Sequence, residues 1–200
     1  DEVMMLGKVR PQAVLRSENF DRETWTLLKN LKDQSPTILL RAAVGFLEAH
    51  GLRVLDPLPW LKPYFCEPGT LTQTSLSGEV SGDIDFGLRL ARRIADLDVG
   101  QTLVVKNRAV VAVEGMEGTD RAILRGGRLA GPGFSVVKAG RTSQDMRLDV
   151  PAVGLDTVKM IVRTGGAALG LEASKVVFFQ KAEALALADA HGVAIVARET

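Results

Sequence analysis

The sequence is poor in cysteine and histidine, and each shortage removes a class of chemistry. Cys66 is the single cysteine among 200 residues, so the chain can form no internal disulfide and no zinc site built mainly from thiolates. The two histidines, His50 and His191, each stand before a glycine at the end of a helix-like stretch, where we expect them to cap helices. A serine or cysteine hydrolase with a histidine base is therefore disfavoured.

Long apolar runs and an excess of one charge are also missing. No stretch approaches the roughly 20 apolar residues that a membrane-spanning helix needs, and residues 1–6 lack the basic start of a secretory signal. The 25 basic and 24 acidic residues give a net charge of +1, and aromatic residues make up only 5%. No basic patch with interleaved aromatics results, so we expect no nucleic-acid partner.

What is present is an alternation of short apolar runs and amphipathic stretches, which predicts an α/β fold. Residues 67–82, rich in glycine, serine and threonine, are interpreted as a linker or an active-site loop. Before it we expect strands and helices over residues 3–9, 22–31, 36–49 and 52–55, then a proline-rich stretch over 56–63. After it we expect a helix (84–95), a hairpin (102–106 and 109–113), a helix (119–125), a glycine-rich loop (126–133), a strand (134–138), a helix (155–164), a strand (176–179), a helix (182–190) and a strand (193–196). The first section thus resembles the remnant of a doubly wound, Rossmann-like domain, followed by a mixed α/β domain.

The most distinctive segment is Gln144-Asp145-Met146-Arg147-Leu148-Asp149-Val150-Pro151. Polar residues alternate with apolar ones from 145 to 150, which predicts an extended strand with Asp145, Arg147 and Asp149 on one face. A carboxylate there could hold a divalent metal or orient water, and the guanidinium could grip phosphate oxygens. Residues four apart on a strand are separated by about 13 Å, so at most one of the two aspartates would bind a given ion. The alternative is an exposed strand face whose charges neutralise one another.

Two further places carry charge at the expected ends of strands. Lys138 ends a strand, where it suits phosphate capture or is simply solvated. The run Val113-Glu114-Gly115-Met116-Glu117-Gly118-Thr119-Asp120 places acidic residues between glycines, and their oxygens suit Mg²⁺ or Mn²⁺. Part of this run also has the character of helix capping residues, namely Glu117, Thr119 and Asp120. A third acidic pair, Asp83 and Asp85, is interpreted as opening the helix at 84–95, with capping explaining at least one of them.

These two acidic motifs, with Val153-Gly154, Leu97-Asp98-Val99-Gly100-Gln101 and Asp83-Ile84, closely resemble the UDP-2,3-diacylglucosamine pyrophosphatase family of the LpxI type. The resemblance covers the whole chain and implies hydrolysis of the substrate's diphosphate to UMP and 2,3-diacylglucosamine 1-phosphate, a step toward lipid A. It also implies Mg²⁺ or Mn²⁺, a cytoplasmic protein peripheral on the inner-membrane surface, bound lipid product and a homodimer. The expected domains are a partial nucleotide-binding-like domain (1–75) and a catalytic domain (76–200). The family's glycine-rich opening does not precede residue 3, so we expect the chain to begin inside a fold.

The resemblance places the family's essential aspartate on Asp145, with Asp149 as the alternative. The expected catalytic residues are Asp145, Arg147 and Asp149; the substrate-binding residues are Lys138, Gln144, Thr119 and Gly118; and the metal ligands are Asp145, Glu114, Glu117 and Asp120. An acyl-chain groove could be lined by Trp60, Leu61, Tyr64 and Phe65. This mechanism requires Asp145 and the 114–120 run to be neighbours in space. The competing hypotheses are a pyrophosphatase for soluble nucleotide sugars and a non-catalytic lipid- or phosphate-binding module.

Overall fold

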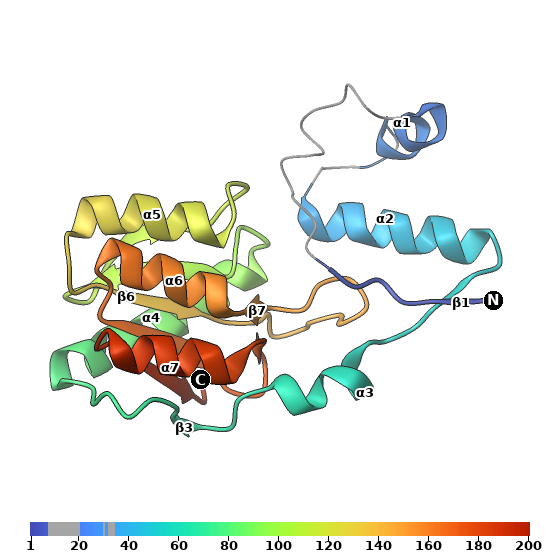
Figure 1. The fold of residues 1–200 in the computed structure, drawn as a ribbon. Coiled ribbons are helices and arrows are strands. Elements are labelled where there is room, and N and C mark those ends of the chain that lie inside the picture. The colour runs from blue at the N-terminus through green and yellow to red at the C-terminus, as the bar shows by residue number, and fades with distance from the viewer. Residues whose placement is uncertain (8–20, 30, 32–34) are drawn as a thin grey trace. The chain divides into compact units, whose positions relative to one another are not determined.

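A computed structural model describes residues 1–7, 21–29, 31 and 35–200 and shows an α/β protein (Figure 1). The chain divides into two compact units, which are described separately. Unit 1 comprises Asp1–Lys62 and Gln144–Val150, and unit 2 comprises Pro63–Ser143 and Pro151–Thr200. The segment that carries Asp145 thus belongs to unit 1, although the chain on both sides of it belongs to unit 2. These units are defined by packing and differ from the domain limits 1–75 and 76–200, which stay a prediction.

Unit 1 pairs two short parallel strands, β1 (Glu2–Val3) and β2 (Arg53–Val54), and contains the helices α1 (Arg22–Lys29) and α2 (Pro36–Ala49). Helix α1 begins after Asp21, whose Oδ1 accepts from the Thr24 N–H at 2.7 Å, the hydrogen bond typical of an N-cap. The bounds of α2 match the prediction, and Gly51 beyond its end adopts a φ of 80°. The strand expected over residues 3–9 ends at Val3 in the structure, and residues 8 and 9 lie outside the described part. The Rossmann-like origin of this unit stays a prediction.

The proline-rich stretch holds only one turn of helix, α3 (Leu58–Leu61), and a 3-10 helix (Lys62–Tyr64) as the chain passes into unit 2. Proline removes a backbone donor and fixes φ, so longer regular structure is not expected here. Within the part of the chain that the structure describes, every helix is too short or too polar to span a bilayer.

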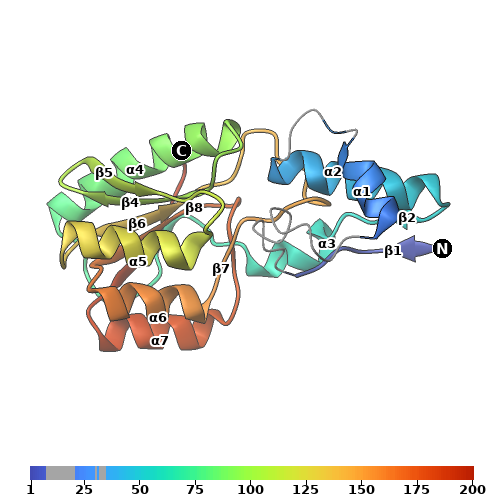
Figure 2. The same ribbon diagram turned by 90° about the horizontal axis from the view of Figure 1, so that it is seen from above.

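Unit 2 is built on a six-stranded mixed sheet with three layers (Figures 1 and 2). In spatial order its strands are β3 (Gly69–Thr70), β10 (Ala194–Arg198), β8 (Ala168–Glu172), β6 (Ser135–Lys138), β4 (Thr102–Lys106) and β5 (Ala109–Val113). The central strands β10, β8 and β6 run parallel, whereas β4 is antiparallel to both of its neighbours. Helix α4 (Gly78–Asp96) covers one face; α5 (Thr119–Ala130), α6 (Leu155–Thr164) and α7 (Lys181–Ala190) cover the other (Figure 2). A separate parallel pair joins β7 (Ala152–Val153) to β9 (Val177–Phe178).

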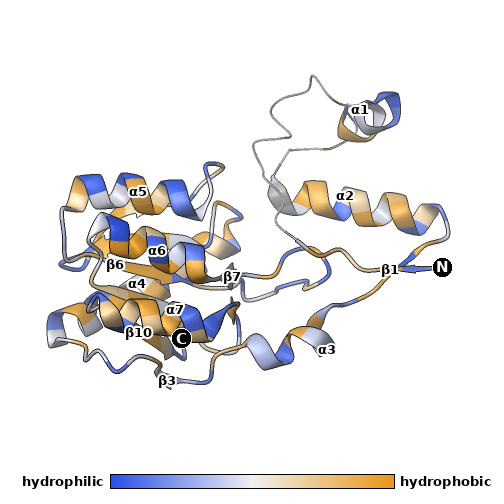
Figure 3. Ribbon diagram, in the orientation of Figure 1, coloured by the Kyte–Doolittle hydropathy of each residue, from blue (hydrophilic) through white to orange (hydrophobic). Residues whose placement is uncertain are grey.

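Two hydrophobic clusters hold the three layers together, one on each face of the sheet. Val137 faces the cluster that contains Ile84 of α4, and its neighbour Val136 faces the cluster that contains Ile123 of α5. This reversal follows from the period of two along a strand. Figure 3 shows the matching pattern, with an apolar β6 and with apolar and polar bands alternating along α5. Burial of both strand faces explains why the central strands are apolar runs.

The hairpin and the helices α6 and α7 of unit 2 were predicted with nearly the observed bounds, because their sequence signals are local, whereas α4 begins before the predicted start at 84 and α5 ends after the predicted end at 125. The Asn107-Arg108 turn between β4 and β5 has φ of 53° and 55°, as a two-residue hairpin turn requires. Asp83 accepts from the backbone N–H of both turn residues, at 3.0 and 2.6 Å. Asp83 therefore fastens the hairpin, and its expected capping role is wrong, because α4 begins at Gly78 after Ser77, whose Oγ accepts from the Val80 N–H at 3.2 Å.

Two expectations for unit 2 are wrong in their element type, and one strand was not expected. The predicted loop at 126–133 begins inside α5, because a Cβ at Gly126 would lie 2.5 Å from Val104 Cγ2, and glycine is kept there for close helix–strand packing. The predicted linker at 67–82 contains β3 and the first turn of α4. The central strand β8, Ala-Leu-Gly-Leu-Glu, was not predicted, because it contains no β-branched or aromatic residue.

Candidate functional site

Polar side chains of unit 2 collect at the carboxyl ends of the parallel strands. Lys138 ends β6 and Glu172 ends β8. Thr102 begins the antiparallel β4 and is paired with Lys138 in the ladder. Glu114 follows β5, and its N–H donates to Thr102 O at 2.9 Å. Ligands of α/β sheets bind at this edge, so these side chains are candidates for a functional site.

Lys138 lies at the centre of a buried polar cluster, which we call the lysine cluster: Lys138, Thr102, Thr119 and Glu114. The lysine is only 6% exposed. Its Nζ donates to Thr102 Oγ1 at 3.2 Å and to Thr119 Oγ1 at 3.1 Å, and lies 3.8 Å from Glu114 Oε2. Thr119 in turn donates to Glu114 Oε1 at 2.8 Å. The alternative of a solvated lysine is therefore wrong, and phosphate capture by Lys138 stays a prediction.

The carboxyl of Glu114 is ionised in this cluster. Burial by itself raises its pKa, but the Lys138 charge and the hydroxyls of Thr102 and Thr119 outweigh burial, so the pKa lies below the ordinary glutamate value. Glu114 Oε2 is buried, faces the Lys138 ammonium and accepts no hydrogen bond from the residues that the structure describes. The cluster is thus a buried ion pair whose remaining polar atoms are served by two threonines.

The start of α5 differs from the expected capping pattern. Gly118 is the N-cap, with φ of 82°, and no side chain of the described residues caps the helix. Glu117 instead forms an ion pair with Arg125 of α5, and Thr119 bonds to Glu114. Burial raises the pKa of Glu117, but the hydrogen bond and charge of Arg125, together with backbone hydrogen bonds of Glu117 and Gly115, outweigh burial, so the pKa is lowered. Asp120 lies in the first turn of α5, where its charge favours the helix dipole.

In unit 1 the segment that contains Asp145 forms a turn, so the predicted extended strand is wrong. The N–H groups of Leu148 and Asp149 both donate to Asp145 O, at 3.0 and 3.3 Å. Asp145 Oδ1 accepts from the Arg147 backbone N–H at 3.1 Å. Aspartate commonly bonds to the backbone two residues ahead, and such local bonds compete with strand formation. The alternating polarity therefore did not place three charges on one strand face.

The turn creates a two-bonded ion pair between Asp145 and Arg147. Arg147 Nε donates to Asp145 Oδ1 at 3.1 Å, and Nη2 donates to Oδ2 at 2.9 Å. Arg147 lowers the pKa of Asp145 against an opposing effect of burial, and Asp145 raises the pKa of Arg147. The two side chains keep 32% and 38% of their surface exposed, so a ligand can reach them. Gln144 Nε2 donates to Asp149 O at 2.8 Å and closes the turn.

The two histidines and the single cysteine have structural roles. His50 and His191 are the C-caps of α2 and α7, and their Nδ1 atoms lie 2.8 and 3.0 Å from Phe46 O and Leu187 O, as predicted. Cys66 is buried and unpaired by disulfide, and burial raises the pKa of its thiol. A buried thiol with a raised pKa is a poor nucleophile.

The carboxylates of the described residues form no group of three that could by itself hold a metal ion. Glu114 and Glu117 each face a basic side chain of their own unit. Asp145 belongs to the other unit, so its expected proximity to the 114–120 run stays a prediction. Mg²⁺ usually takes one or two protein carboxylates and completes its shell with water and phosphate oxygens, so the oxygen donors of Asp145 fit such an ion.

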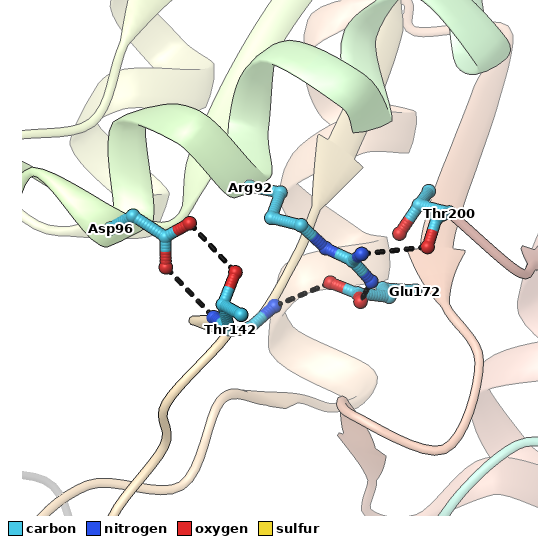
Figure 4. Close-up of polar contacts among 6 residues, drawn as sticks. Arg92, Asp96, Thr142, Glu172 and Thr200 are labelled. Atoms are coloured by element: carbon cyan, nitrogen blue, oxygen red, sulfur yellow. Dashed lines mark hydrogen bonds and ion pairs between the residues drawn. The ribbon is translucent and has the colours of Figure 1, made fainter.

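Sequence reasoning missed a second polar group at the same edge of the sheet (Figure 4). Glu172 is 1% exposed, forms an ion pair with Arg92 of α4, and accepts from the Gly140 N–H at 2.9 Å. Asp96 accepts from Thr142 N–H at 2.7 Å and from its Oγ1 at 2.8 Å, and the Thr142 N–H lowers the pKa of Asp96. The local sequence signal for Glu172 was only an acidic residue at the end of the apolar run Leu169-Gly170-Leu171-Glu172.

Comparisons with known proteins identify the family of the chain. The model of the LpxI C-terminal domain matches residues 67–196, and that of the LpxI N-terminal domain matches residues 1–63. The UDP-2,3-diacylglucosamine pyrophosphatase LpxI of Caulobacter vibrioides is 31% identical over an alignment of 163 positions that covers 78% of this chain and 58% of that relative. The chain therefore spans less than two thirds of the relative's length. Because the C-terminal model alone matches more than half of the residues, the chain belongs to the LpxI family.

Proposed function

We propose that the protein is a hydrolase that splits the diphosphate of UDP-2,3-diacylglucosamine into UMP and 2,3-diacylglucosamine 1-phosphate in lipid A biosynthesis. The observation that carries this proposal is the match of both LpxI domain models to consecutive parts of the chain, 1–63 and 67–196. The name of the Caulobacter relative points to the same substrate. In this reaction water forms a new bond to one phosphorus and the bridging oxygen leaves with the other phosphate.

The ionised carboxylate of Asp145 is the proposed catalytic group. A carboxylate offers about four acceptor positions, and three bonds from Arg147 occupy most of them. The remaining position lies on Oδ2, which can accept from one water molecule or bind one hard cation. Asp145 therefore orients a single partner, and Asp149 remains the alternative.

Arg147 is the proposed partner of the phosphate oxygens. Its guanidinium has five N–H donors, of which two bond to Asp145 and one lies 3.4 Å from Glu48 Oε1. The donors that remain can bind two oxygens of a diphosphate and stabilise the charge that develops on it. Asp145 holds the guanidinium in place, so it is oriented before substrate arrives.

The start of α5 and the lysine cluster are the proposed phosphate-binding elements of unit 2. No described side chain caps the N-terminus of α5, and backbone N–H groups at such a position bind phosphate oxygens. The Gly118 N–H donates to Gly115 O at 3.1 Å, so Gly118 shapes the start of the helix, and Thr119, which is held by Lys138 and Glu114, provides the proposed N–H group. Lys138 adds positive charge behind the site and fixes the position of the helix start.

A divalent cation, Mg²⁺ or Mn²⁺, is part of the proposal, with Asp145 as its protein ligand. When bound, such an ion neutralises diphosphate charge and polarises water. Glu114, Glu117 and Asp120 stay predicted as further ligands; Glu114 and Glu117, like Asp145, are each paired with a basic side chain.

The proposal also places the protein in the cytoplasm, as a homodimer on the inner-membrane surface. Trp60 and Tyr64 are 58% and 44% exposed, which leaves apolar surface for acyl chains, whereas Leu61 is buried.

The test is a UMP-release assay with the acylated substrate and with unacylated UDP-glucosamine, each with and without EDTA. We expect release from the acylated substrate alone, with loss of activity in EDTA and recovery with excess Mg²⁺. Equal hydrolysis of the unacylated sugar would instead indicate a pyrophosphatase for soluble nucleotide sugars. Binding of the lipid product without release of UMP would indicate a non-catalytic module.

A further inference from the structure

The stretch between β6 and the Asp145 turn is held by acidic side chains of unit 2. Gly140 N–H donates to Glu172 Oε2 at 2.9 Å, and Thr142 N–H donates to Asp96 Oδ1 at 2.7 Å (Figure 4). The Thr142 hydroxyl donates to Asp96 Oδ2 at 2.8 Å. Arg141, between them, forms an ion pair with Asp98. An irregular stretch normally bonds to water, but here three consecutive residues are each fixed by a carboxylate.

The burial of Glu172 carries a large desolvation penalty. It ends a strand whose other residues are apolar and buried, and it is itself only 1% exposed. A buried carboxylate loses its hydration and persists only with well-placed partners. Arg92 supplies the opposite charge and is itself oriented by a bond from its Nη1 to Thr200 O at 2.6 Å. A buried acid kept where an apolar residue would pack points to a role for its bond to Gly140.

The other end of the Asp145 segment is also tied to unit 2. Val177 N–H donates to Pro151 O at 2.9 Å, and Phe179 N–H donates to Val153 O at 3.0 Å. The segment Gln144–Val150 therefore leaves unit 2 and returns to it at two fixed points. Thr142 stands only three residues before Asp145, so the path of the chain at Thr142 limits where Asp145 can lie.

We propose that Glu172 and Asp96 are positioning residues: by holding Gly140 and Thr142, they fix the path of the chain into the segment that carries Asp145. Neither residue touches the reacting atoms; each acts through a backbone N–H group. This inference rests on the proposed function of Asp145. Displacement of a catalytic group by about 1 Å can lower a rate about 100-fold, which gives such anchors a measurable effect.

The kinetic test uses the whole chain with Glu172→Ala, Glu172→Gln, Asp96→Ala and Asp96→Asn. We expect the alanine variants to lower kcat by about tenfold or more with little change in KM. The amide variants should recover part of the loss, because an amide oxygen still accepts from a backbone N–H. Asp156→Asn is the matched control, because Asp156 is an exposed acid of unit 2 that bonds only to Lys159, at 3.1 Å, among the contacts described.

Hydrogen exchange of residues 140–150, measured by mass spectrometry without substrate, tests the anchors independently of activity. We expect faster exchange in Asp96→Ala and Glu172→Ala, and unchanged exchange elsewhere and in Asp156→Asn. If Glu172→Ala does not fold, Asp96→Ala decides, because its side chain is exposed. Normal kcat and normal exchange in Asp96→Ala would overturn the inference. A wild-type chain that releases no UMP would overturn the proposed function, whereas exchange would still report whether the anchors hold the segment.

Discussion

Asp145→Asn separates a catalytic role of Asp145 from a structural one. The amide keeps Oδ1, which can still accept from the Arg147 N–H and Nε, but it loses the charge. In the wild type, Arg147 Nη2 donates to Asp145 Oδ2 at 2.9 Å. In the variant an NH₂ group takes the place of Oδ2 and cannot accept this bond. One ionic bond is therefore lost, while the backbone bonds of the turn, from Leu148 and Asp149 to Asp145 O, remain.

The expected effects on stability and on rate differ widely in size. The pair is about one third exposed, so solvent screens it and its loss costs about 0.5–1 kcal/mol of unfolding free energy. For a chain of this length, that lowers Tm by no more than about 4 °C. Loss of a catalytic carboxylate lowers a rate about 10²- to 10⁴-fold, and 10³-fold corresponds to about 4 kcal/mol of barrier.

UMP release and thermal unfolding of the same preparations measure the two effects. Asp156→Asn again serves as control, since it removes an exposed acid paired with Lys159. We expect Asp145→Asn to lose nearly all UMP release with a folded spectrum and a Tm close to wild type. A rate within about threefold of wild type would refute the catalytic assignment. A fall in Tm above about 10 °C would show that the pair supports the fold instead.

Three further predictions concern unit 2. The folded-state pKa of Glu114 lies below the ordinary glutamate value, because Lys138 and the threonine hydroxyls outweigh burial, so the ionised carboxylate stabilises the fold at neutral pH. This contribution is lost as pH falls through the folded-state pKa, and urea unfolding should show a steeper loss of stability in acid for wild type than for Glu114→Gln. Lys138→Met leaves the buried Glu114 charge without its cation and should lower the free energy of unfolding by about 3–5 kcal/mol. Adding Glu114→Gln in a double variant should restore part of this loss. If the changes in unfolding free energy of the two single variants simply add up in the double variant, the ion pair is contradicted. Gly126→Ala should destabilise the fold by about 1–3 kcal/mol, because the new Cβ would lie 2.7 Å from Val104 Cβ. Gly82→Ala is the matched control: its Cβ meets only the flexible Arg108 guanidinium, so it should be neutral or stabilising by up to about 1 kcal/mol. Equal Tm values for the two variants would contradict the packing argument.

Elements with strong local signals were predicted well. The bounds of α2 and α6 and the β4–β5 hairpin agree with the sequence patterns, because caps, turn residues and helical periodicity act within a few residues. The strand β8 carries no such signal. It is buried on both faces between parallel neighbours, and a short apolar run without β-branched residues does not distinguish a strand from a buried helix.

The Asp145 segment shows how a correct pattern can lead to a wrong element. Its polar and apolar residues alternate as in a strand, yet the carboxylate of Asp145 bonds to the backbone and side chain of Arg147 and closes a turn. Periodicity reports only which side chains favour burial. It does not include the competition between local side-chain bonds and strand pairing.

The α/β class, the LpxI family and the charged residues on which the proposed chemistry depends can all be inferred from residue patterns. Which of these charges meet could be learned from the fold alone. It paired Lys138 with Glu114 and joined Glu172 to Arg92 and Gly140, whereas the partner of Asp145, Arg147, lies only two residues away in the sequence. The physical reason is that the strength of an ion pair depends on burial and on distance across the fold, and strands far apart in sequence set both.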